Sequence, residues 1–178
     1  EYNYSYTDTV WKDKLTQYSK DNTTYSMTYD EIGNPLSYMG MNFTWQGREL
    51  ASATVGNTNV AYKYDIDGLR TKKTVGDTVY EYQYLNDKLF YEKCGNRELY
   101  FFYDADGLLT AIRRYDNGEA TAHYFVLSNS RGDVEVIYDN NNGLLARYYY
   151  DAWGNVIDIK DASGNSITSS SHIANINP

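Results

Sequence analysis

The chain has 178 residues, a net charge of −8 and 21 tyrosines, which raise the aromatic share to 16%. This length predicts one globular unit or one piece of a repeat array. The acidic balance argues against nucleic-acid binding, because phosphate recognition needs clustered basic residues. No apolar run reaches the roughly 18 residues that a membrane-spanning helix needs.

Cysteine and histidine content excludes further classes of protein. A single cysteine, Cys94, cannot form an internal disulfide framework. The two histidines, His123 and His172, lack the neighbouring cysteine pairs of a zinc site. We therefore expect neither a metal nor a cofactor.

Alternating runs predict strands along the chain. Residues 2–6 read as an edge strand with little charge, and residues 60–64 and 80–84 alternate with a period of two. No segment carries a sustained 3.6-residue period, so no helix is predicted.

One motif, an aromatic residue followed by Asp-x-x-Gly, recurs between these runs. Complete copies contain Tyr29, Asp30 and Gly33; Tyr64, Asp65 and Gly68; Tyr103, Asp104 and Gly107; and Tyr150, Asp151 and Gly154. A copy with one extra residue contains Tyr138, Asp139 and Gly143, and degenerate copies lie at 43–48, with Trp45, and at 82–87. The final aromatic residues of successive copies lie about 20 positions apart in the middle of the chain, which indicates a structural repeat.

Each copy predicts a β-hairpin with a four-residue turn. The aspartate can accept hydrogen bonds from backbone N–H groups two residues on, and the glycine accepts a positive φ. A lone hairpin is only marginally stable in water, so successive hairpins must pair side by side. The predicted fold is all-β, with tandem antiparallel hairpins forming a curved, spiralling ribbon.

We expect this ribbon over residues 1–159. A last turn follows at 161–165, and the residues beyond it lack aromatic side chains. Residues 160–178 are therefore predicted to be a polar, weakly ordered tail.

Two features of the sequence have a chemical interpretation besides a structural one. Asp65 and Asp104 open segments that resemble calcium loops, but position 12 is Gly76 in one and Tyr115 in the other, where a calcium loop needs glutamate. Cys94 has no local signature of a base that would make it a nucleophile. We expect turn residues here and no enzymatic activity.

The tandem Tyr-Asp-x-x-Gly units resemble the RHS/YD-repeat family over nearly the whole chain. The strongest part runs from Gly132-Asp133-Val134 to Tyr150-Asp151-Ala152-Trp153-Gly154-Asn155, and resembles the start of the RHS-repeat-associated core, here residues 131–159. In the family an Asn-Pro pair such as Asn177-Pro178 leads into the end of that core. We therefore expect a fragment that stops before the core's C-terminal end.

The resemblance implies a function as well as a fold. Family members form β-shells that enclose a C-terminal toxic domain, and they are often secreted or attached to the bacterial cell wall. The expected role is a structural shell segment whose partners are the rest of the parent chain and its cargo. The alternative is an adhesin-like module that binds cell-wall or host glycans through exposed tyrosine and tryptophan side chains. The isolated chain is also expected to self-associate through its open strand edges.

Overall fold

The structure is a computed structural model that describes residues 2–141, 143–170 and 172–175. These residues form two compact units, Glu1–Tyr80 and Glu81–Pro178. The strands are β1 (Tyr2–Ser5), β2 (Gln17–Lys20), β3 (Thr23–Ser26), β4 (Ser37–Tyr38), β5 (Met41–Gln46), β6 (Glu49–Val55), β7 (Thr58–Tyr64), β8 (Arg70–Val75), β9 (Thr78–Leu85), β10 (Lys88–Cys94), β11 (Arg97–Tyr103), β12 (Leu109–Asp116), β13 (Glu119–Ser128), β14 (Val134–Asp139), β15 (Gly143–Tyr150) and β16 (Val156–Lys160). A short 3₁₀ helix, η1 (Ile173–Asn175), follows them.

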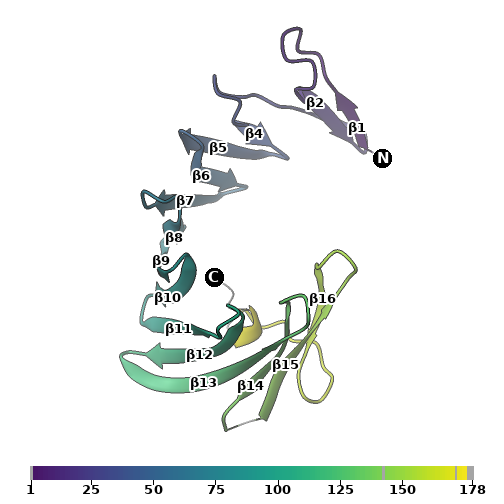
Figure 1. The fold of residues 1–178 in the computed structure, drawn as a ribbon. Coiled ribbons are helices and arrows are strands. Elements are labelled where there is room, and N and C mark those ends of the chain that lie inside the picture. The colour runs from purple at the N-terminus through teal and green to yellow at the C-terminus, as the bar shows by residue number, and fades with distance from the viewer. Residues whose placement is uncertain (1, 142, 171, 176–178) are drawn as a thin grey trace. The chain divides into compact units, whose positions relative to one another are not determined.

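The first unit contains two groups of strands (Figure 1). Strands β1, β2 and β3 form a separate three-stranded antiparallel sheet in which β1 is an edge strand, and β4 to β8 lie side by side in chain order. Tyr18 on β2 is almost fully buried, stacks on Tyr25 with ring centroids 4.9 Å apart and lies 5.7 Å from the ring of Tyr38. Tyrosine therefore supplies much of the packing here that aliphatic residues supply elsewhere.

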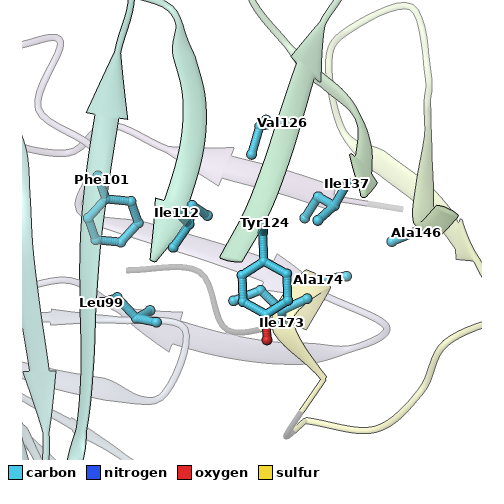
Figure 2. Packing of buried hydrophobic residues seen from close by; sticks show 9 residues of the cluster. All are labelled: Leu99, Phe101, Ile112, Tyr124, Val126, Ile137, Ala146, Ile173 and Ala174. Atoms are coloured by element: carbon cyan, nitrogen blue, oxygen red, sulfur yellow. The ribbon is translucent and has the colours of Figure 1, made fainter. Parts of the chain in front are cut away.

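In the second unit each strand from β10 to β15 pairs with the strand that follows it along the chain. Because side chains alternate between the two faces of a strand, register places apolar residues in rows on one face. Ile112 lies opposite both Phe101 and Tyr124, and Ile137 lies opposite both Val126 and Ala146. These rows form the buried cluster drawn in Figure 2, which Leu99, Ile173 and Ala174 complete.

The segment after β16 contributes to this cluster. It first runs antiparallel to β16, where the Ile167 amide donates to the Ile159 carbonyl at 2.7 Å. Ile173 and Ala174 of η1 are then buried, and the Tyr148 hydroxyl donates to the Ala174 carbonyl at 2.8 Å. The weak order expected of residues 160–178 stays a prediction, which hydrogen exchange of the amides after Lys160 would measure.

The all-β class with tandem antiparallel hairpins is confirmed. Within the described residues the one helical element is the three-residue η1, which is too short to show a 3.6-residue period in the sequence. No helix among them is long and apolar enough to cross a membrane.

Candidate functional site

The sequence repeat corresponds to a turn with one recurring geometry. In the copy that starts at Asp65, Oδ1 accepts from the amides of Asp67 at 3.0 Å and Leu69 at 2.9 Å. The Gly68 amide donates to the Asp65 carbonyl at 3.2 Å, and the Asp65 amide donates to the Leu69 carbonyl at 2.9 Å. The aspartate thus closes a five-residue loop with its own side chain, which is the local reason why the chain reverses here.

The same set of bonds recurs in five further turns. They begin at Asp30, Asp104, Asn129, Asp151 and Asp161. The fourth residue of each turn is a glycine with a positive φ, for example +80° at both Gly68 and Gly107. Only glycine adopts such angles without strain, so the backbone explains why glycine recurs there.

The turn at Asn129 was missed by sequence reasoning. Asn129 and Gly132 have the spacing of Asp-x-x-Gly, but Ser128 precedes them instead of an aromatic residue. Asparagine replaces aspartate because its Oδ1 accepts the same two amides, from Arg131 at 2.9 Å and Asp133 at 3.1 Å. A search for Asx-x-x-Gly without the aromatic requirement would have found it.

Some turns carry a second side-chain bond. The Asn155 side-chain amide donates to Asp151 Oδ2 at 2.7 Å, and that of Asn165 donates to Asp161 Oδ2 at 3.2 Å. The side-chain and backbone donors of Asn155 lower the pKa of Asp151, and the backbone and side-chain donors of Asn165 lower the pKa of Asp161. These carboxylates are held ionised as acceptors within a turn, which is not the state of a general acid.

Three tyrosines of the motif hydrogen-bond to an earlier part of the chain. The Tyr29 hydroxyl donates to the Leu15 carbonyl at 2.8 Å, that of Tyr103 to the Leu89 carbonyl at 2.8 Å, and that of Tyr150 to the Val134 carbonyl. Burial raises the pKa of all three hydroxyls and of the Tyr64 hydroxyl. A half-buried ring with a bonded tip explains why tyrosine is used rather than phenylalanine.

The remaining motif residues depart from this pattern. Asp139 accepts from the Asn141 amide at 2.6 Å and lies opposite Gly143 in the β14–β15 ladder, so the copy with an extra residue forms a different turn. Tyr138 lies within β14, where it faces Phe125 and Leu144 on the two neighbouring strands.

The two tryptophans of the glycan alternative differ in their surroundings. Trp45 is half-buried and donates from Nε1 to the Pro35 carbonyl at 2.7 Å. The Trp153 side chain lies in the turn that begins at Asp151 and is 89% exposed. Trp153 therefore remains available as a platform, whereas Trp45 is part of the packing.

Within each unit, the described motif residues do not meet in one centre. They lie at the ends of successive hairpins, and their hydrogen bonds stay within the turn or reach a nearby segment of the same unit. Among residues 2–141, 143–170 and 172–175 no group of three or more histidine, cysteine or carboxylate side chains could hold a metal ion. What the arrangement provides is a repeated support for a sheet.

No protein-family model matches the chain. Over 141 residues it is 33% identical to the tRNA3(Ser)-specific nuclease WapA of Bacillus spizizenii and 32% identical to the tRNA nuclease WapA of Bacillus subtilis (strain 168). Each alignment covers 73% of this chain and 6% of the relative, so the chain corresponds to a small part of those proteins.

A solved structure of the Photorhabdus luminescens Tc holotoxin pore shares the fold, with a TM-score of 0.51 and 18% identity over 89% of this chain and 10% of that chain. The recurring Tyr-Asp turns, the similarity to the WapA nucleases and this shared fold lead to one conclusion. The chain belongs to the RHS/YD-repeat family.

Proposed function

We propose that the chain is a structural wall segment of a large secreted or surface-associated bacterial RHS protein, and that it forms part of a shell around a C-terminal toxin. The observation that carries this proposal is that one turn, closed by its own Asp or Asn side chain, recurs in six places. In each turn that side chain accepts hydrogen bonds from backbone amides, so no nucleophile, base or acid converges there. A repeated support with an apolar face suits a wall, and we propose no catalytic activity for the segment itself.

The test needs the parent protein with its C-terminal domain in place. Limited proteolysis should spare that domain in the intact protein and digest it when it is expressed alone. Deleting whole hairpins from this segment should restore digestion without changing the domain's sequence. Equal digestion in the intact and the deleted proteins would contradict enclosure.

A second candidate function is glycan binding, which the 89% exposure of the Trp153 side chain favours. An exposed indole on a rigid turn offers a flat apolar face to a sugar ring. A glycan array would show reproducible binding that Trp153→Ala abolishes. Trp45→Ala is the packing control, because it should lower stability as well as any binding.

A further inference from the structure

Two grooves lie at equivalent places in the repeat, one in each unit. The groove in the first unit, here called the polar groove, has a volume of about 390 Å³ and is lined in part by Gln46, Glu49, Ala51 and Lys63. The groove in the second unit, here called the aromatic groove, also has a volume of about 390 Å³, and Leu85, Lys88, Phe90 and Phe102 occupy the corresponding positions two repeats later.

The turns next to the grooves support this equivalence. Tyr64 and Asp65 line the polar groove, and Tyr103 and Asp104 line the aromatic groove. Glu49 lies beside the turn glycine Gly68, as Lys88 lies beside Gly107. The fold therefore creates a groove beside each of these turns, and the sequence alone decides its chemical character.

Three apolar side chains that line the aromatic groove are not buried. Leu85 is 63% exposed, Phe90 is 37% exposed and Phe102 is 40% exposed. The polar groove shows that glutamine, alanine and lysine serve at the same three positions, so the fold does not need large apolar groups there. Exposed apolar side chains that packing does not require indicate a binding surface.

The two rings are held by neighbours on the same sheet. Tyr100 meets Phe90 edge to face, with centroids 5.7 Å apart and an interplanar angle of 76°. The Arg113 guanidinium lies 5.9 Å from the centroid of the Phe102 ring. Rings fixed in this way lose little freedom when a ligand arrives, which favours binding.

Polar groups complete the aromatic groove. Lys88 donates one proton from Nζ to the Gly107 carbonyl at 2.9 Å and keeps two others. Asp104 uses Oδ1 for two backbone amides, and within the described part of the chain its Oδ2 has no hydrogen-bond partner. Asn86 adds a side-chain amide. One cation, one anion and one amide complement a neutral ligand that has several hydroxyl groups.

We infer that the aromatic groove binds one pyranose ring of a neutral glycan. The sugar's C–H face lies against Phe90 and Phe102, and its hydroxyls bond to Asn86, Lys88 and Asp104. The groove volume falls within the usual range of small-ligand sites, roughly 300–1,000 Å³. The inference competes with glycan binding at Trp153, because it places the sugar in the aromatic groove instead, and it is independent of the wall proposal.

The experiment uses the 178-residue protein and an array of neutral oligosaccharides built from glucose, galactose, mannose and N-acetylglucosamine, followed by titration calorimetry with the strongest binder. The groove variant Phe90→Ala/Phe102→Lys installs the residues of the polar groove, and its affinity should fall at least about tenfold. The control is Phe125→Ala, whose phenylalanine is 42% exposed and lies outside the groove lining, and it should keep the wild-type affinity.

Three outcomes would overturn the inference: no array binding by the wild-type protein, binding that survives in the groove variant, or binding lost only in Trp153→Ala. Far-UV circular dichroism checks that the variants fold. If the double variant does not fold, the conservative Phe102→Leu should still weaken binding. The reciprocal variant Ala51→Phe/Lys63→Phe should raise the binding stoichiometry from one site to two. Toxin enclosure, tested by proteolysis, is unaffected by any of these results.

Discussion

Replacing Arg97 by methionine should be among the most destabilising substitutions in the second unit. Glu92 lies on β10 with only 1% of its side chain exposed, and Arg97 Nη2 donates to Glu92 Oε1 at 2.6 Å across the β10–β11 hairpin. The substitution leaves the buried carboxylate without its charged partner, which costs about 3–5 kcal/mol in comparable buried pairs.

The same hairpin contains a matched control. Lys93 lies directly opposite Glu98, and their ion pair spans 3.1 Å with side chains 43% and 23% exposed. Because water screens this pair, Lys93→Met should cost about 0–1 kcal/mol. The two substitutions remove one cation each from neighbouring positions, so the difference between them isolates the effect of burial.

Urea unfolding followed by far-UV circular dichroism measures both costs, as a shift of the midpoint at an unchanged slope. The double variant Glu92→Leu/Arg97→Met should recover most of the lost stability, because it removes the stranded charge. If Arg97→Met were no more destabilising than Lys93→Met, the description of Glu92 as a buried, paired charge would be refuted.

Three further predictions concern the turns, alkaline stability and association. Gly107→Val should cost about 1–3 kcal/mol, because the φ of +80° there strains any residue with a Cβ, whereas the Lys88 end that a Cβ would meet, at 2.6 Å, can swing away; an unchanged midpoint in urea unfolding would argue against this turn conformation. Burial raises the pKa of both Tyr91 and Tyr148 to about 12, above the value of 10.0 expected when unfolded, so stability should be fully present below pH 10 and fall between pH 10 and 12; a flat stability profile to pH 12 would contradict this. The isolated chain should self-associate through exposed edges such as β1, since screening at physiological salt limits repulsion by the charge of −8 to about 8 Å; a single monomer in sedimentation velocity at high micromolar concentration would rule it out.

Strands and turns could be predicted because their causes are local. Asp65 reaches the amides of Asp67 and Leu69 within five residues, and the period of two sets the faces of the flanking strands. Both relations involve residues that are close together in the chain, so the sequence alone predicts an all-β chain of hairpins. The turn at Asn129 did not match the motif, because Ser128 stands where the motif has an aromatic residue and asparagine stands where it has aspartate.

The aromatic groove could not be found in the same way. Phe90 and Phe102 look in the sequence like any other strand aromatics, and a period of two does not tell which face of a sheet is covered. The structure shows that Phe90 and Phe102 line a groove and stay exposed, whereas Phe101, which lines the same groove, is only 5% exposed and belongs to the buried cluster.

The sequence by itself determined the repeat, the turn chemistry and the family resemblance, because each depends on residues close together in the chain. Only the tertiary structure decided burial: it buried the Glu92 side chain on β10 and brought the Ala174 carbonyl to the hydroxyl of Tyr148. Burial depends on how the sheet of the second unit bends and on what later segment packs against it. Tyr148 and Ala174 are 26 positions apart, so no short sequence window contains both, and periodicity cannot predict their contact.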